Sequence, residues 1–259
     1  MTNLYKKTDY ESASYRRYPE ARQLLPEAEK VWLDRVRAYT KDRMMHRLLD
    51  VGSGTGRFAP LLAHGLGCEV VGVEPSDQML RAAVEADTAR LVRYVKGNAE
   101  SLPFAGESFD GAWLSMVIHH IDRERSAEEL ARVLRHGGMV LIRNTFRDRL
   151  TGDRVIPFYT FFPGALDVDQ RRLPSTTDVI EIFEKKGFEK IALDRVDQIL
   201  EQSLKGLLAR LRKGGISTLE HLSEVQREEG FRQLAIAAEN EREETPVMET
   251  IDLLALTKK

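Results

Sequence analysis

The sequence predicts an α/β fold in which one mostly parallel sheet carries helices on both faces. Short β-branched runs alternate with segments of helical period between Arg47 and Phe146, which is the pattern of a parallel sheet. A glycine-rich turn follows the first of these runs directly. The 259 residues, 42% of them hydrophobic, supply enough apolar surface for one large core. We therefore expect a single domain rather than two.

Seven segments have the length and β-branched content of strands. We predict strands at Arg47–Val51, Glu69–Val73, Leu91–Lys96, Phe109–Met116, Gly138–Thr145, Lys190–Leu200 and Val247–Thr257.

Helices are predicted where apolar residues recur at helical spacing. Ser76 and Ser126 each precede such a segment and are the expected N-caps, and we expect Gly137 to end the helix that Ser126 opens. Other helices are predicted at 24–43, 175–186, 204–211 and 219–239, with a further apolar helix directly after the glycine-rich turn.

The chain outside the alternating core differs in composition. Residues 1–46 form an N-terminal arm, rich in tyrosine, followed by a helix. Residues 47–146 form the core, and residues 147–259 supply helical covering elements and the last two strands. The aromatic segment Pro157–Gly164 contains several helix-breaking residues, so we expect a loop that forms a pocket wall.

Composition excludes several classes of protein. The formal net charge is −2, which argues against nucleic acid as the main partner. The single cysteine, Cys68, excludes an internal disulfide framework and a cysteine-based zinc cluster, and favours the cytoplasm. We see no secretory signal and no apolar run long enough to span a membrane.

The segment Leu48–Phe58 carries the strongest functional signal. A buried strand leads into a Gly-x-Gly-x-Gly turn formed by Gly52, Gly54 and Gly56. Glycines allow unusual φ values and remove the Cβ atoms that would keep a ligand away from the backbone. Glu74 follows Gly56 by 18 residues, at the end of the next strand, where a carboxylate accepts hydrogen bonds from a ribose. Together the two features predict a cofactor that contains adenosine.

The spacing of the glycines argues against a dinucleotide. The dinucleotide fingerprint, Gly-x-Gly-x-x-Gly, directs a helix N-terminus at a pyrophosphate, and here the third glycine comes one residue early. Asp50, just before the turn, would repel a phosphate but would attract an amino group. An adenosine that carries an amino acid satisfies both ends of this site.

Five motifs in this order resemble class I S-adenosylmethionine-dependent methyltransferases, and the nearest branch is methyltransferase type 11, whose members are similar to enzymes of ubiquinone and menaquinone biosynthesis. The motifs are Leu48–Phe58, Val71–Ser76, Gly97–Phe104, Ser108–Asp110 and Ile118–His120. The resemblance covers about Arg47 to Thr145 and implies a Rossmann-like, seven-stranded sheet with S-adenosyl-L-methionine as the cofactor.

Carried over to this sequence, the resemblance implies a set of cofactor-binding residues. Gly52, Ser53 and Gly54 would contact the methionine and ribose, Asp50 the amino group and Glu74 the ribose hydroxyls. The remaining candidates border the adenine, close the pocket or bind the cofactor carboxylate, and they are Pro75, Met79, Asn98, Ala99, Glu100, Ser115, Met116 and Arg17. Asn98 stands where the family usually has Asp, and its amide oxygen accepts a hydrogen bond without charge.

His119 and His120 are the candidates for a role beside the transferred methyl group. The resemblance favours His120 as the catalytic base, and a tyrosine of the arm is the alternative. If the strand continues through both histidines, their side chains point to opposite faces and do not share a metal ion. We therefore expect no metal. Substrate contacts are predicted for Tyr10, Tyr15, His119, Phe158 and Phe162. The basic residues Arg171, Arg172, Arg210, Arg212 and Lys213 are expected on solvated faces.

The sequence therefore predicts a methyltransferase that acts on O, N or C of a small, apolar or aromatic acceptor. One alternative is an NAD(P)-dependent oxidoreductase, although no Tyr-x-x-x-Lys pair occurs in the chain. Another is a non-catalytic cofactor-binding protein of the same fold. The acceptor, the pathway and any homo-oligomer are left open.

Overall fold

The computed structural model describes residues 21–150 and 155–259, which form a seven-stranded sheet of order β3-β2-β1-β4-β5-β7-β6. Its strands are β1 (Arg47–Val51), β2 (Glu69–Glu74), β3 (Val92–Lys96), β4 (Phe109–Ser115), β5 (Leu134–Asn144), β6 (Phe188–Glu201) and β7 (Val247–Lys258). Strands β1 to β5 pair in parallel, and β7 runs antiparallel to both β5 and β6. The predicted α/β fold with a mostly parallel, seven-stranded sheet is confirmed.

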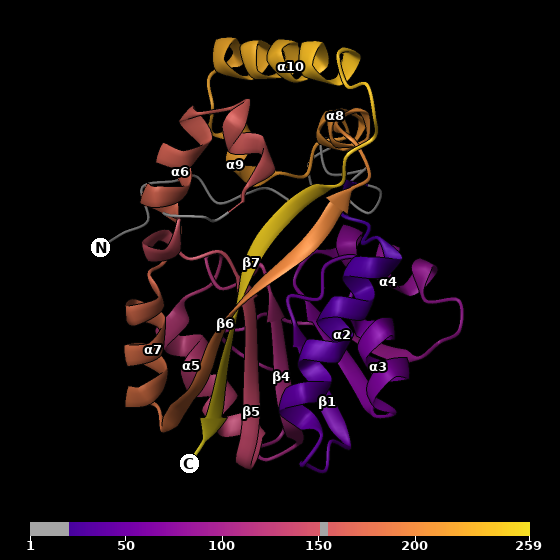
Figure 1. Ribbon diagram of the computed structural model, residues 1–259. Helices are drawn as coiled ribbons and strands as arrows, with labels where there is room; N and C mark the ends of the chain where they lie inside the picture. Colours follow the sequence, from indigo (N-terminus) through magenta and orange to yellow (C-terminus); the bar gives the residue numbers. More distant parts are fainter. Residues whose placement is uncertain (1–20, 151–154) are drawn as a thin grey trace.

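Helices cover both faces of this sheet (Figure 1). The structure has α2 (Pro26–Thr40), α3 (Ala59–Leu66), α4 (Asp77–Ala86), α5 (Arg123–Val133), α6 (Gly164–Arg172), α7 (Thr176–Lys185), α8 (Leu204–Arg212), α9 (Ser217–Glu220) and α10 (Glu224–Glu239), and the short 3-10 helices η2 (Arg147–Arg149) and η3 (Pro157–Thr160). None of the helices in the described part of the chain is long and apolar enough to cross a membrane.

Two cores lie on the two faces of the sheet. One contains Leu130 of α5 and Phe183 of α7, packed against β4 and β5. The other contains Trp32 of α2 and Leu62 of α3, where Trp32 meets Trp113 of β4 edge to face with ring centroids 6.2 Å apart. These two layers fix the sheet so that β1, β2 and β4 end at one edge, as their register shows.

A third core lies apart from the sheet and forms the cover. It gathers apolar side chains from η3, α6, α8, α9 and α10. Figure 1 shows these helices above the carboxyl ends of the parallel strands, where the long strands β6 and β7 extend to meet them. The cover therefore stands over the edge at which the glycine-rich turn lies.

Several predicted element boundaries were wrong. Asp122 is the N-cap of α5, where its side chain accepts from the backbone N–H groups of Glu124 and Arg125, and Ser126 lies buried inside the helix. This helix ends at Val133, and β5 begins at once and runs through Gly137. The helix predicted at 219–239 is two helices, α9 and α10. The predicted loop 157–164 contains η3, and α6 after it was missed.

Candidate functional site

The glycine-rich turn crosses over the end of β2 and is held there by backbone hydrogen bonds. The N–H groups of Gly52 and Ser53 both donate to the carbonyl of Val73, at 2.8 and 3.0 Å. Gly52 and Gly54 have φ of +66° and +57°, in the left-handed region that glycine adopts without strain. A Cβ at Gly54 would meet no atom within 4 Å, so the space beside this peptide is open.

Glu74 is fixed against this turn by both of its carboxylate oxygens. Oε2 accepts from the N–H of Gly54 at 2.9 Å, and Oε1 accepts from the N–H of Ser76 at 2.9 Å. The side chain is 6% exposed, so these contacts form out of water, where a charge-assisted hydrogen bond is strong. Glu74 thus links the first turn to the start of α4.

Asp50 is a buried carboxylate at the other side of the turn. It is 2% exposed, and burial together with the nearby charge of Glu74 raises its pKa to about 7, while Arg57 opposes that shift. Among the residues that the structure describes, no hydrogen bond reaches the Asp50 carboxylate. The hydroxyl of Ser53 is likewise buried without a hydrogen-bond partner.

The turn and Asp50 line a first cavity, whereas Glu74 lies behind the turn and does not. Its walls are Arg22, Asp50, Gly52, Ser53, Gly54, Thr55, Arg57, Phe58 and Ser115. An anionic wall at Asp50 and cationic walls at Arg22 and Arg57 suit the ammonium and carboxylate ends of an amino acid. The open space at Gly54 and the unpartnered Ser53 hydroxyl fit a ligand that lies against the backbone, so the residues present agree with an amino-acid-bearing cofactor.

The candidates predicted for the adenine lie along the same edge but do not line this first cavity. Met79 and Ala99 are buried, while Pro75 and Asn98 are exposed. Glu100 accepts from the backbone N–H of Asp122 at 2.9 Å. Their contacts with a cofactor stay predictions. Tyr10, Tyr15 and Arg17 lie outside the described residues.

A second cavity adjoins the first through the shared wall of Arg22. It is lined by Met116, His119, His120, Thr145, Ile156, Phe158, Tyr159, Asp169, Arg172, Leu173, Gly215, Ile216, Ser217, Thr218, Glu249 and Arg22. Met116, predicted to close the cofactor pocket, lines this cavity instead of the first. It has φ of +57°, which is strained for a residue with a side chain, and such strain concentrates at functional sites.

The two histidines lie beyond the end of the strand. β4 ends at Ser115, and the chain turns, so that the rings of His119 and His120 lie side by side with centroids 4.0 Å apart. The condition under which they would face opposite ways is therefore not met, and both line the second cavity. Among residues 21–150 and 155–259, no three His, Cys, Asp or Glu side chains gather as a metal site would require.

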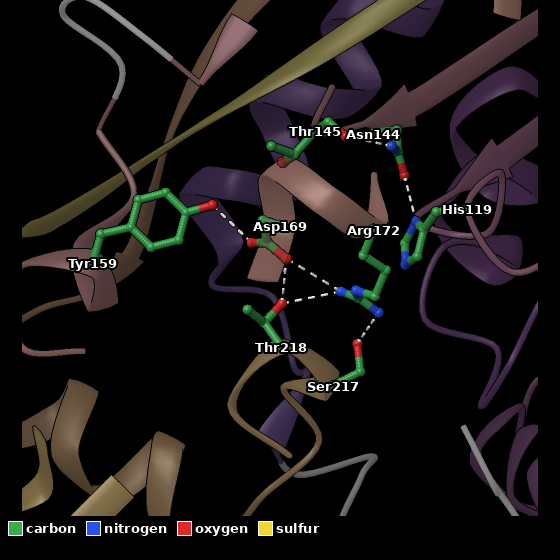
Figure 2. Close-up of polar contacts among 8 residues, drawn as sticks. All are labelled: His119, Asn144, Thr145, Tyr159, Asp169, Arg172, Ser217 and Thr218. Atoms are coloured by element: carbon green, nitrogen blue, oxygen red, sulfur yellow. Dashed lines mark hydrogen bonds and ion pairs between the residues drawn. The ribbon is translucent and has the colours of Figure 1, made fainter. Parts of the chain in front are cut away.

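His119 is held in one orientation by Asn144. Its Nδ1 lies 3.1 Å from Asn144 Oδ1, and Asn144 Nδ2 donates to the carbonyl of Thr145 (Figure 2). Because the amide nitrogen is engaged elsewhere, Asn144 presents oxygen to the ring, and Nδ1 carries the proton. Burial, and then the charges of His120 and Arg172, lower the pKa of His119 well below 6.5, so the ring is neutral at pH 7.

Opposite the histidines, a polar network joins η3, α6 and α9 (Figure 2). Asp169 accepts from the hydroxyls of Tyr159 at 2.7 Å and Thr218 at 2.8 Å. Arg172 donates to Ser217 Oγ at 2.9 Å and Thr218 Oγ1 at 3.0 Å, and pairs with Asp169 at 3.4 Å. The side chains of Asp169 and Arg172 are only 6% and 7% exposed.

Sequence reasoning missed this network. The prediction of solvated faces was wrong for Arg172, and also for Arg210, which is 8% exposed and pairs with Glu201. The spacing of Asp169 and Arg172 by three residues was the available signal, since it places both on one helix face. Phe158 lines the second cavity as expected of a substrate contact, whereas Phe162 packs in the cover's core against Phe231.

Comparison with known proteins finds a match for the core of the sheet. Residues 49–142 match the family model described as a methyltransferase domain. The malonyl-[acyl-carrier protein] O-methyltransferase of Herminiimonas arsenicoxydans is 31% identical over 169 residues, which are 64% of this chain and 61% of that protein. The first curated relatives that the chain matches are covered over about half of their length, from 40% to 61%.

Solved structures share the fold over most of the chain. A putative methyltransferase from an antibiotic biosynthesis pathway of Anabaena variabilis aligns with a TM-score of 0.67 at 22% identity, over 90% of this chain and all of that one. Phosphoethanolamine N-methyltransferase 2 of Haemonchus contortus, in complex with S-adenosyl-L-methionine, aligns with a TM-score of 0.62 at 20% identity, over 98% of this chain and 60% of that one.

Proposed function

We propose that this chain, whose residues 49–142 match the model of a methyltransferase domain, is a class I methyltransferase that transfers a methyl group from S-adenosyl-L-methionine to O, N or C of a small, apolar or aromatic acceptor. The observation that carries the proposal is the pair of adjoining cavities at the carboxyl ends of the strands. One cavity is built by the glycine-rich turn and Asp50, and the other is lined by His119, His120 and the cover.

The first cavity would hold the methionine end of the cofactor. Asp50 would pair with the amino group, and Arg22 and Arg57 would attract the carboxylate, with Arg17 of the arm as the candidate carried over from the family. The hydroxyl of Ser53 and the open space beside Gly54 suit the methionine and ribose. Glu74, at the end of β2 beside this turn, would accept from the ribose hydroxyls.

When bound, S-adenosyl-L-methionine supplies an electrophilic methyl on a sulfonium, which an acceptor atom attacks in line. The chain's own contribution is orientation of the acceptor in a site sheltered by the cover. Orientation of this kind lowers a barrier by up to roughly 7–11 kcal/mol in favourable cases.

We propose His120 as the general base for an acceptor that must lose a proton. It is half-buried and lines the second cavity. His119 is a positioning or substrate-contact residue in this scheme, since Asn144 holds its Nδ1 proton. If His120→Ala left turnover unchanged across pH while His119→Asn altered it, the two roles would be exchanged.

The wider setting follows from composition. The near-neutral charge and single cysteine support a cytoplasmic enzyme with a small-molecule partner and neither nucleic acid nor membrane. We propose one domain, in which 1–46 form the arm and helix, 47–146 the cofactor-binding core and 147–259 the cover and last strands.

The test is a pair of titrations followed by a transfer assay. We expect S-adenosyl-L-homocysteine to bind and NAD to have no effect. The reverse result would favour an NAD(P)-dependent oxidoreductase. Methyl transfer from labelled cofactor into a component of a cell extract would then separate an enzyme from a non-catalytic cofactor-binding protein.

A further inference from the structure

We propose that the second cavity recognises its acceptor by a carboxylate, which Arg172 binds while the acceptor's apolar body rests against Ile156, Phe158 and Ile216. The inference rests on the proposed function, because it names the class of acceptor for the same site. It narrows a small apolar or aromatic acceptor to one that bears a negative charge.

The guanidinium of Arg172 has donors left over after its structural contacts. One Nη1 hydrogen goes to Ser217, and Nη2 serves Thr218 and Asp169. Nε is buried and has no hydrogen-bond partner among the described residues, and five N–H bonds are available in all. A buried donor without a partner is unfavourable, so a ligand oxygen that accepts from this guanidinium is favoured over one that cannot.

The carboxylate of Asp169 neutralises Arg172 incompletely. Its contact with Arg172 is long, at 3.4 Å, and the same carboxylate is shared with the hydroxyls of Tyr159 and Thr218. In Figure 2 Asp169 and His119 lie on opposite sides of the Arg172 side chain. The side that faces the histidines is therefore turned away from the compensating charge.

The charged groups around the cavity favour an anion beside the histidines. Arg22 and Arg172 both lower the pKa of His119, so the electrostatic potential beside the His119 ring is positive. Of the two acids that line the cavity, Asp169 is engaged as described, and Glu249 accepts from Gln198 Nε2 at 2.7 Å. His119 is neutral, so it does not repel the guanidinium of Arg172.

The chemistry of the walls selects the rest of the acceptor. Ile156 and Ile216 are aliphatic, and Phe158 presents an aromatic ring that also stands edge to face against Tyr159 at 5.0 Å between centroids. A flat apolar body suits such walls. Benzoate combines that body with a carboxylate, and benzamide has the same shape without the charge, so the two form a matched pair of probes.

The experiment measures the binding of benzoate and benzamide to the full chain at pH 8 by calorimetry, with and without S-adenosyl-L-homocysteine. We expect benzoate to bind at least tenfold more tightly than benzamide. Arg172→Gln should bring the ratio of the two dissociation constants close to one, and Arg172→Lys should retain part of the preference. The control is Arg171→Gln, an exposed arginine on the same helix, which should leave the ratio unchanged.

The ratio of the two dissociation constants distinguishes a ligand-binding role of Arg172 from a purely structural one. If Arg172 only ties α6 to α9, Arg172→Gln will weaken both probes equally, and the proposal fails. It also fails if benzamide binds the unaltered chain as well as benzoate does, or if neither probe binds. If the unaltered chain prefers benzoate but does not bind S-adenosyl-L-homocysteine, the proposed cofactor is wrong and the proposed carboxylate site stands, because the two titrations are independent.

Discussion

The two cavities of this molecule are built by different means. The shape of the first cavity is set mainly by backbone hydrogen bonds. The N–H group of Gly52 donates to Val73 of β2, and that of Gly54 donates to the Glu74 carboxylate. In the second, side chains from three separate elements meet, as Asp169 does with Tyr159 and Thr218. A site set by backbone geometry suits a constant cofactor, whereas a site set by side chains changes with each substitution. We infer that acceptor choice resides in the cover.

The two regions also differ in what supports them. The glycine-rich turn follows β1 and bonds through its N–H groups to Val73 of β2, and both of these strands are buried over most of their length. The cover has its own apolar core, which gathers Phe162, Leu207 and Leu234 away from the sheet. Local opening follows the density of buried contacts, so the cover can loosen while the sheet stays intact. The predictions below test this separation.

The largest effect is expected for Asp169→Asn. The change leaves Arg172 as a buried charge without its counter-ion, and breaking a buried pair in this way costs about 3–5 kcal/mol. Hydrogen exchange should show faster exchange in α6 and α9, with β1 and β4 unchanged. Asp167→Asn, an exposed acid in the first turn of the same helix, should cost less than about 1 kcal/mol. Equal acceleration across the sheet would show that the two regions do not open separately.

Glu74→Gln should leave the cover unchanged and weaken only the binding of a ligand in the first cavity. The amide keeps one acceptor oxygen but loses the charge that the N–H groups of Gly54 and Ser76 share, at about 1.5–3 kcal/mol for a charged hydrogen bond. We expect S-adenosyl-L-homocysteine affinity to fall by about 100-fold. Glu69→Gln, at the exposed start of the same strand, is the matched control and should change the dissociation constant less than twofold. Calorimetric titration measures both.

The same contrast explains how much the sequence could predict. The turn from Gly52 to Gly56 and the position of Glu74 lie close together in the sequence, and they contact each other through short-range hydrogen bonds to Val73 and Glu74. Strands β1, β2 and β4 could be predicted for a similar reason, because their apolar runs are buried over most of their length. The placement of Glu74 at the turn was therefore expected, although its role toward the cofactor stays a prediction.

The cover could not be predicted in this way. Arg172 and Ser217 lie 45 positions apart, and Arg210 reaches the carbonyl of Ala21 across 189 positions. No local pattern distinguishes such an arginine from one in water, since both occur on amphipathic helices. The placement of the two histidine rings could not be predicted for a related reason, because the chain leaves the strand at Met116 through a left-handed φ that only the surrounding structure imposes.

The protonation of Asp50 gives a prediction of intermediate size. Its pKa of about 7, raised chiefly by burial, means that the carboxyl is mostly neutral at pH 6 and mostly ionised at pH 8. An ammonium pairs with the ionised form, so S-adenosyl-L-homocysteine affinity should rise by about tenfold between these pH values. Asp50→Asn should remove the dependence and lower the affinity at pH 8. A rise that persists in Asp50→Asn would place the titrating group elsewhere.

The smallest effect is expected for alanine at Gly54, and comparison with alanine at Gly137 distinguishes backbone strain from a role in ligand binding. Gly54 and Gly137 both have positive φ, +57° and +74°, and a Cβ at either would meet no atom within 4 Å. Alanine at each should therefore cost a similar amount of stability, about 1–2 kcal/mol for the left-handed conformation. Only Gly54 lies at the first cavity, since Gly137 is near the amino end of β5 at the opposite edge of the sheet. Denaturant unfolding should show matched losses, whereas S-adenosyl-L-homocysteine affinity should fall only in Gly54→Ala. Equal affinities in the two variants would mean that the cofactor does not approach the backbone at Gly54, and the turn would then be a structural connection between β1 and α3.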